Sequence, residues 1–411
     1  MKRMAEPARS LNPFRVLNAH RNFRLFWIGQ TISLIGTWMQ QVGQGWLALQ
    51  LSNSAFIVGL VAAAGSLPIL FFSLYAGVIV DRRDKLKLVI IAQVLLSIEA
   101  AVLWWLVWSG RITIPVLIAL AAINGMISAV EIPARQSMIV DLVGREDVVD
   151  AIALNSGGFN LARIVGPSIA AATIAGVGLA WCFGINALSY IAVIGCLAAI
   201  RLPKFVPAET ILAAREGFEE GIAYIRSRRD VTGIMGLIAV YAIFGLPFVS
   251  MMPVIARDVL HTGAGGYGFL VTLVGVGALT GALAFAAFSS RFRRGRMFVV
   301  SAYSFAALLL VFSFVRSMTL AGVLLIFIGL TMMVNGALAN GMLQSIVPDE
   351  LRGRVMAAYV FVYVGFTPIG SLIEGAIGHA FGVQWAIGGG AAIMLAYAAW
   401  AFGKFPEIKR A

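Results

Sequence analysis

Four polar residues recur at helical spacing inside an otherwise apolar stretch of the chain. Asn124, Ser128, Glu131 and Arg135 follow one another at intervals of four, three and four residues, so a helix would place them on one face. A carboxylate whose surroundings change can bind and release a proton. This face is therefore a candidate proton-transfer site at Glu131. The alternative is a helix-face salt bridge between Glu131 and Arg135, one turn apart.

Further polar side chains interrupt other apolar stretches, where each is costly unless it faces a cavity or a partner. Two acids among them, Glu99 and Glu374, are rival proton sites; for Glu99 a structural hydrogen bond is the favoured interpretation. The remaining cavity or substrate candidates lie mostly on three helical faces, and they are Ser33, Thr37, Gln40, Gln44, Asn160, Arg163, Tyr241, Asn335, Tyr359 and Tyr363.

The segments that carry these residues are too apolar for a soluble protein. Hydrophobic residues make up 60% of the 411 positions and charged residues 12%, against roughly 25% charged in ordinary soluble domains. A spanning helix needs about 20 apolar residues. The composition excludes a soluble enzyme and predicts an all-α polytopic membrane protein with twelve spans, at 24–50, 55–80, 87–109, 112–137, 149–176, 178–200, 231–256, 265–290, 296–315, 318–342, 352–378 and 382–403.

A charged stretch divides the spans into two sets of six. We expect an N-terminal six-helix bundle at 1–200, a linker at 201–230 and a C-terminal six-helix bundle at 231–411. Within the linker Ile211, Phe218, Ile222 and Ile225 recur near the helical period, which predicts an amphipathic helix at the membrane interface. A loosely ordered tether is the alternative.

The basic residues predict the orientation of the chain. With the N-terminus in the cytoplasm, 27 of the 31 Lys and Arg residues fall on the cytoplasmic side, three fall outside and Arg163 lies within a span. This is a positive-inside pattern with both termini cytoplasmic. The net charge of +12 is thereby explained, and nucleic acid is not an expected partner. Cys182 and Cys196 are too far apart on a helix for a disulfide, and no metal-ligand spacing is present.

The two halves also resemble each other. At an offset of 209 residues Gly59 corresponds to Gly268, Arg82 to Arg291 and Lys85 to Arg294. Two six-span halves related by a parallel repeat are typical of transporters, with the site at their interface near the membrane midplane. A non-transporting membrane sensor or scaffold, the alternative from another class, has no need of such a repeat.

The loop between the second and third spans resembles a signature of the major facilitator superfamily. It reads GVIVDRRDK at 77–85, and the family has Gly, three residues and Asp-Arg there; Asp84 stands where the family has Gly. The stretches NFRLFWIGQTISLIGTWMQ at 22–40, EIPARQSMIVDLVGREDVVDAIALNS at 131–156 and ELRGRVMA at 350–357 resemble the bacterial branch that contains the enterobactin exporter. The resemblance implies the major facilitator fold and a bacterial inner-membrane location.

The resemblance also implies roles for individual residues. Asp81, with Gly77 and Arg82, would dock on the positive N-terminus of the helix that begins near Leu351 and close the cytoplasmic side, with Arg135 as a charge partner. A solvated basic loop is the alternative for Arg82. Ala162, Gly166 and Pro167 are similar to the antiporter motif of exporting members, although several of the motif's glycines are alanines here; small-residue packing is the alternative.

Arg163, alone on the fifth span, is expected to face the central cavity and to pair with Glu131 or with an anionic part of the substrate. Together these features predict a monomeric, proton-coupled exporter of a small or medium organic molecule, siderophore-like or drug-like, that works by alternating access. It needs no cofactor besides the proton gradient. An importer or a lipid flippase of the same fold is the alternative.

Overall fold

The chain is almost entirely helical, as its apolar segments predict. The computed structural model describes residues 14–202, 214–288 and 293–409, without the side chains of 73–75, 78, 81 and 214–218. No strand occurs in this part of the chain. Ten of its helices are long and apolar enough to cross a membrane. The helix at residues 21–52 is not among them, because its apolar run is interrupted by Gln, Ser and Thr side chains.

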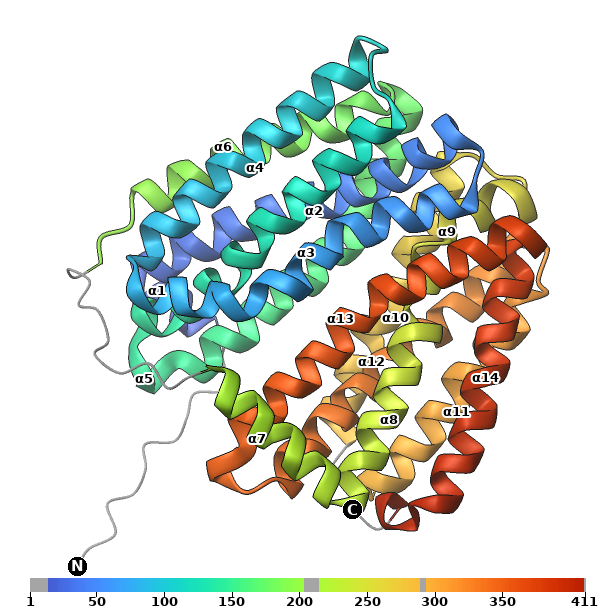
Figure 1. Cartoon of the computed structure of the whole chain (residues 1–411). Helices are drawn as coiled ribbons and strands as arrows, with labels where there is room; N and C mark the ends of the chain where they lie inside the picture. Colours follow the sequence, from blue (N-terminus) through green and yellow to red (C-terminus); the bar gives the residue numbers. More distant parts are fainter. Residues whose placement is uncertain (1–13, 203–213, 289–292, 410–411) are drawn as a thin grey trace, which may run out of the picture.

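The first group of helices comprises the N-terminal half of the chain (Figure 1). The element α5 consists of two helical segments, one for each of two predicted spans, and they are separated by a kink at Gly144, whose φ of 74° is not helical. A positive φ is a conformation that glycine adopts without steric cost. The elements are α1 (Arg15–Ala19), α2 (Arg21–Ser52), α3 (Ala55–Arg82), α4 (Lys85–Trp108), α5 (Ile114–Gly176) and α6 (Ala180–Ala198).

The second group begins with a span that is not one continuous helix. Pro247 and Pro253 lack the backbone N–H that a continuing helix needs, and the span is divided into short helical pieces around them. These pieces are α8 (Arg229–Phe244), η1 (Leu246–Val249), α9 (Met252–Val254) and the π-helical turn η2 (Ile255–Val259). The remaining elements are α10 (Ala264–Phe288), α11 (Arg294–Ser313), α12 (Met318–Ile346), α13 (Asp349–Phe381), α14 (Val383–Lys404) and η4 (Pro406–Lys409).

With α5 counted as two spans, with α2 included and with α8 to η2 counted as one, the described helices account for all twelve predicted spans. The prediction of an all-α fold with many membrane-spanning helices is confirmed for the described residues. The second part of the predicted linker forms α7 (Ala214–Ser227), in which Ile225 is buried against the second group. Glu220 forms an ion pair with Arg354 at the start of α13. Ile211 and the side chain of Phe218 lie outside the described residues.

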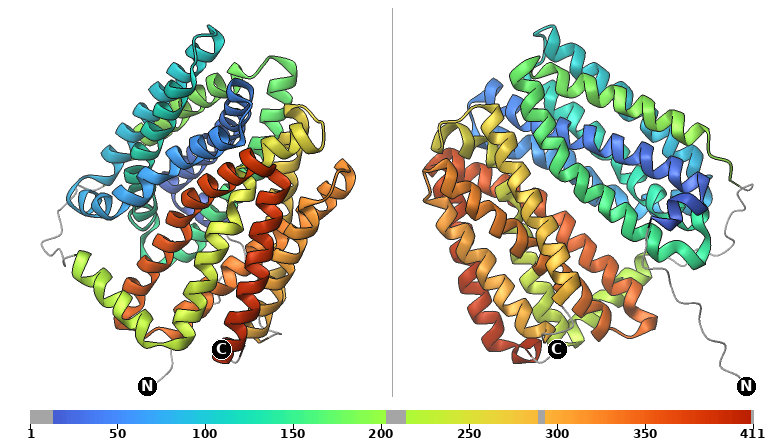
Figure 2. Two further views of the ribbon diagram at one scale, coloured as in Figure 1. Left: turned by 45° about the vertical axis from the view of Figure 1, so that its right-hand side comes forward. Right: turned by 180° about the vertical axis from the view of Figure 1, so that it is seen from behind.

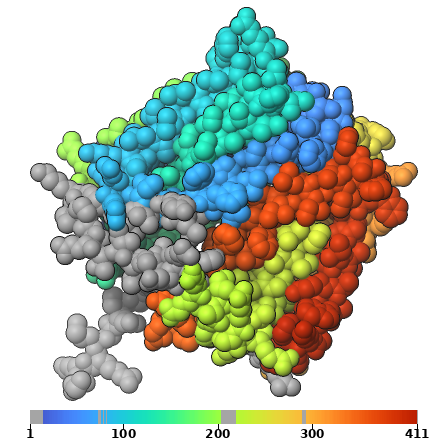
Figure 3. Space-filling model, in the orientation of Figure 1, coloured from blue at the N-terminus to red at the C-terminus, as the bar shows by residue number. Residues whose placement is uncertain are grey.

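The two groups meet near one end and diverge toward the other (Figures 1 and 2). We call the end that contains Lys85, Arg201 and Lys404 the basic end, and the opposite end, with Asn53 and Gly382, the far end. The contact consists mainly of α3 against α13 and α5 against α10. On the molecular surface α3 and α13 lie side by side toward the far end (Figure 3).

Two glycines that correspond in the internal repeat make these close contacts possible. A Cβ atom at Gly59 would lie 2.3 Å from the carbonyl oxygen of Ser371 on α13. A Cβ atom at Gly268 would lie 2.8 Å from the carbonyl oxygen of Pro167 on α5. Each half therefore contributes a glycine to a helix crossing with the other half, so the 209-residue repeat is a repeat of contacts as well as of sequence.

Candidate functional site

A cavity of ≈ 500 Å³ lies between the helices of the first group and reaches Val249, Ser250 and Tyr267 of the second. This volume is within the range of small-molecule sites. Seven residues predicted from helical spacing line it: Ser33, Thr37, Gln44, Asn124, Ser128, Glu131 and Arg135. The polar faces of α2 and of the first part of α5 are thus brought together.

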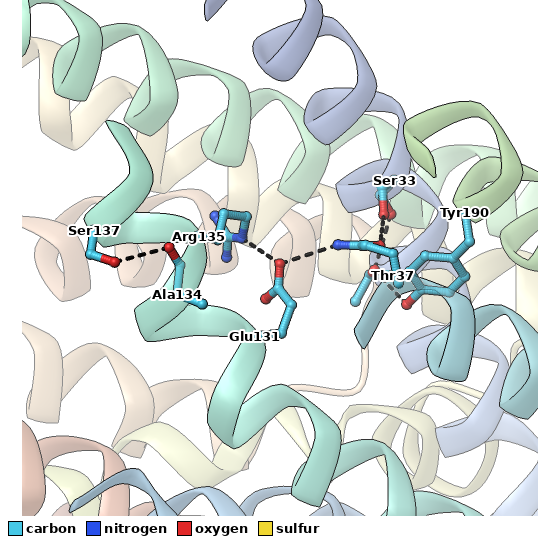
Figure 4. Close-up of polar contacts among 8 residues, drawn as sticks. Ser33, Thr37, Glu131, Ala134, Arg135, Ser137 and Tyr190 are labelled. Carbon is cyan, nitrogen blue, oxygen red and sulfur yellow. Dashed lines mark hydrogen bonds and ion pairs between the residues drawn. The ribbon is translucent and has the colours of Figure 1, made fainter. Parts of the chain in front are cut away.

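Glu131 and Arg135 form a buried ion pair in the wall of this cavity. Arg135 Nε donates to Glu131 Oε1 at 2.7 Å, and their side chains are only 9% and 7% exposed. A buried ion pair is stabilised only when further hydrogen bonds compensate for lost hydration. Gln93 of α4 supplies one, from Nε2 to Glu131 Oε1 at 3.2 Å. Figure 4 shows the pair on α5 facing Ser33 and Thr37 of α2.

Glu99 is the centre of a second group of hydrogen bonds. Gln40 Nε2 donates to its Oε2 at 3.0 Å, and Asn124 Nδ2 donates to the same oxygen at 3.1 Å. Gln40 Oε1 in turn accepts from Asn186 Nδ2 at 2.7 Å. Four helices, α2, α4, α5 and α6, are therefore joined through one carboxylate. This arrangement supports the structural role that was favoured for Glu99.

Comparison with known proteins places this arrangement in a family. Residues 8–411 match the family described as "Transmembrane secretion effector". The chain belongs to this family of major facilitator transporters. It is 25% identical over 370 residues to the staphyloferrin A transporter of Staphylococcus aureus (strain NCTC 8325 / PS 47), covering 88% of this chain and 90% of the relative. It is 26% identical to the multidrug efflux pump Tap of Mycolicibacterium fortuitum, covering 82% and 85%.

Solved structures show the same fold at low identity. A peptide transporter POT in complex with sulfate superimposes with a TM-score of 0.76 at 11% identity, covering 98% of this chain and 99% of that one. A bacterial homolog of the human lysosomal transporter Spinster, in an inward-facing and unoccupied conformation, has a TM-score of 0.73 at 12% identity, covering 94% and 98%. The relatives are transporters, so the prediction that this chain is a transporter and not an enzyme is confirmed.

Arg163 of the transporter lies between the two groups of helices, near Trp38 and Met332; it is not among the residues that line the cavity, and no acid lies beside it in the described structure. Its Nη2 lies 3.8 Å from the sulfur of Met332 on α12, and its guanidinium lies 5.8 Å from the ring centroid of Trp38 on α2. The predicted ion pair with Glu131 is wrong in this structure. The reason is local, because Glu131 is already held by Arg135 on its own helix and by Gln93.

The second group contributes tyrosines to the centre of the transporter. Tyr363 of α13 stacks on Tyr241 of α8, with ring centroids 6.2 Å apart, and on Tyr359, at 5.7 Å. Tyr241 donates to the carbonyl oxygen of Met332 at 3.4 Å. Asn335, in contrast, donates to Ser301 of α11 at 3.2 Å, inside the second group. Of these C-terminal candidates, the three tyrosines are joined in one stack and Asn335 is not.

Glu374 is separate from the cavity. It is 1% exposed, and neither carboxylate oxygen has a hydrogen-bond partner in the described structure. A Cβ atom added at Gly390 of α14 would lie 3.7 Å from Glu374 Oε1, so the carboxyl group is directed at that helix. Among the described residues, no neighbouring group therefore stabilises a charge on this carboxyl group, and an unpaired buried charge is very costly.

The predicted latch involves residues at the basic end. The side chain of Asp81 lies outside the described residues, so its role stays a prediction. Arg82 is exposed, and no heavy atom lies within 4 Å of the position that a Cβ would take at Gly77. Arg135, the predicted charge partner of the latch, forms its ion pair with Glu131 instead.

The small residues of the antiporter-type motif pack tightly against α2. A Cβ atom at Gly166 would lie 2.5 Å from Trp38 Cβ and 2.9 Å from the carbonyl oxygen of Ile35. Ala162 is fully buried, and Pro167 faces Gly268 of the other group. The motif therefore allows α5 to approach both α2 and α10. Asn160, on the same helix, only donates to Ser156 one turn back, at 2.9 Å.

Two participants were not singled out from the sequence. Asn186 and Tyr190 of α6 are fully or almost fully buried and bond to Gln40 and Thr37, respectively. Their spacing of four residues on one helix, together with Ser189, was the available signal. It is weak, because Asn and Tyr are both tolerated in apolar helices when they have a partner.

Proposed function

We propose that this transporter exports a small or medium organic molecule, siderophore-like or drug-like, in exchange for protons. The observation that carries this proposal is the buried Glu131–Arg135 pair in the cavity wall. The two relatives support the proposed export, because one is named a staphyloferrin A transporter and the other a multidrug efflux pump.

The coupling step uses the charge balance of this pair. While Glu131 is ionised, Arg135 is neutralised at 2.7 Å. Protonation of Glu131 leaves the guanidinium without a counter-charge and makes Glu131 a weaker acceptor for Gln93, whose hydrogen bond joins α4 to α5. Proton binding and the conformational equilibrium are then linked, and each biases the other by the same free energy.

The orientation and location complete the proposal. The basic end faces the cytoplasm of a bacterial cell, in the inner membrane, because 27 of the 31 Lys and Arg residues lie on that side of the predicted topology. The two groups then diverge toward the cytoplasm, so the conformation described here is inward-facing. We propose that one chain is the transporting unit, because residues from both groups of helices of the same chain line the cavity.

Everted membrane vesicles test the coupling. The vesicles are acidified by ATP hydrolysis, the pH gradient is followed with acridine orange, and staphyloferrin A, erythromycin and ethidium are added in turn. Wild-type vesicles are expected to lose part of the gradient on addition of at least one compound. Glu131→Gln should abolish that loss, whereas Glu374→Gln should retain it. Retention of wild-type proton exchange, with unchanged pH dependence, in Glu131→Gln would disprove the assignment.

A further inference from the structure

The guanidinium of Arg163 is a cation at the meeting point of the two groups that has no acidic partner among the described residues. Its neighbours are the indole of Trp38 and the thioether of Met332. A thioether sulfur is only a weak hydrogen-bond acceptor, and an aromatic face satisfies one side of the planar cation. The N–H groups of Arg163 therefore have no strong hydrogen-bond acceptor among the described residues.

The acids of the surrounding helices do not compensate for this charge. Glu131 is neutralised by Arg135, and Glu99 is held by the amides of Gln40 and Asn124. Glu374 is directed at α14. The titratable groups that act on Arg163 are Tyr241 and Tyr363, both neutral phenols in their ordinary state. None of these carboxylates therefore contacts Arg163, and among the described residues no counter-charge lies beside its guanidinium.

Aromatic side chains surround this charge on both sides of the interface. Trp38 belongs to the first group, and its ring also packs edge-on against Phe159, with centroids 5.8 Å apart. Tyr241 and Tyr363 belong to the second group and stack on each other. Tyr241 and Arg163 both contact Met332, which places the stack next to the guanidinium.

We propose that Arg163, Trp38, Tyr241 and Tyr363 form a subsite for an organic anion with a planar or aromatic body. A carboxylate accepts two parallel N–H bonds from a guanidinium, and the aromatic rings contact the flat body of the ligand. The subsite consists of residues from both groups of helices, so an anion bound there contacts both moving parts. This proposal rests on the proposed function and specifies its substrate class.

A pair of dyes with one ring system and opposite charges tests the subsite. Carboxyfluorescein is an anionic xanthene and rhodamine 123 a cationic one. Their binding to the purified full chain in dodecyl maltoside micelles is measured by fluorescence anisotropy at pH 8. The wild-type protein is expected to bind carboxyfluorescein more tightly than rhodamine 123. Arg163→Gln should weaken carboxyfluorescein binding about ten- to a hundredfold, the effect of losing a charged hydrogen bond, and leave rhodamine 123 unchanged or tighter.

Control variants separate the charge from general damage. Arg163→Lys keeps the charge and loses the planar fork, so its carboxyfluorescein affinity should be intermediate. Arg316→Gln removes an exposed arginine after α11 and should change neither affinity. A competition with unaltered protein needs no variant: benzoate should displace carboxyfluorescein and benzamide should not. Micelles with added phosphatidylglycerol show whether a lipid phosphate takes the same place.

Several results would overturn the proposal. These are absence of carboxyfluorescein binding by the wild-type protein, equal losses for both dyes in Arg163→Gln, equal displacement by benzoate and benzamide, and displacement by phosphatidylglycerol but not by benzoate. Micelles hold no proton gradient, so any of these results leaves the role of Glu131 unaffected. Conversely, if Glu131→Gln keeps wild-type proton exchange in the vesicles, the coupling assignment is disproved, and the dye-binding result still decides the anion subsite.

Discussion

Substitution of Gly59 by alanine should open the far end of the transporter. The added Cβ would lie 2.3 Å from the carbonyl oxygen of Ser371, and ordinary contact begins at 3.4 Å, so α3 and α13 must separate by roughly 1.1 Å at this point. Overpacking of this kind costs about 1–3 kcal/mol. If the cost falls only on the state with a closed far end, the equilibrium between the two states changes by about 5- to 150-fold.

Distances between spin labels measure this change. The labels are attached to Ser109→Cys and Ser317→Cys, in the far-end loops of the two groups, in a background without the native cysteines. Gly59→Ala should increase the population with the longer distance. Gly65→Ala on the same helix is the matched control, because the nearest heavy atom to its Cβ position is 3.7 Å away. An unchanged distribution in Gly59→Ala, or an equal change in Gly65→Ala, would refute the reasoning.

Three further predictions concern the contacts around the cavity and at the far end. Gly36→Ala should lower the free energy of unfolding by about 1–3 kcal/mol, because the added Cβ would lie 2.3 Å from Asn186 Oδ1. Thermal unfolding measures this loss. Gly195→Ala is the control and should change the stability little, because the space around Gly195 is open. Glu99→Leu should destabilise the protein more than Glu99→Gln in the same assay, because leucine leaves the buried amide of Gln40 and the half-buried amide of Asn124 without their acceptor. An unsatisfied buried donor costs about 1–3 kcal/mol, and equal melting temperatures would contradict the network. Arg257→Gln removes the 2.7 Å hydrogen bond to Asn53 that joins the two groups. The spin labels at positions 109 and 317 should then report that the equilibrium shifts toward the open far end by about 0.5–1.5 kcal/mol. A shift toward the closed far end would contradict this prediction.

The positions of the spans could be predicted from the sequence, because a helix that crosses the hydrocarbon core of a membrane must contain about 20 mostly apolar residues. Apolar runs of 20 or more residues gave the helix positions to within a few residues, and they included the more polar α2, predicted at 24–50. The spacing of Glu131 and Arg135 was also sufficient, because residues four apart on a helix are neighbours whatever the fold.

Contacts between distant helices could not be predicted in the same way. The partner of Arg163 depends on how α5 packs against α2 and α12, and hydrophobic periodicity contains no information about that packing. The same holds for Glu374, whose helical face pointed to the cavity while its carboxyl group is directed at α14. Asn186 was missed because its importance lies in a single hydrogen bond to another helix.

The polar character of α2 has a consequence for how the protein is made. This helix supplies Ser33, Thr37 and Gln40 to the hydrogen bonds of the first group, and it is not among the helices apolar enough to span by composition. It also leaves the ribosome before α3 to α6 do, and the translocon sorts segments by apolarity as they emerge. Its polar partners on α4, α5 and α6 have not yet been synthesised at that moment. The residues that hold the finished cavity together therefore weaken the membrane insertion of α2, and α2 must enter the bilayer together with the strongly apolar α3 that follows it.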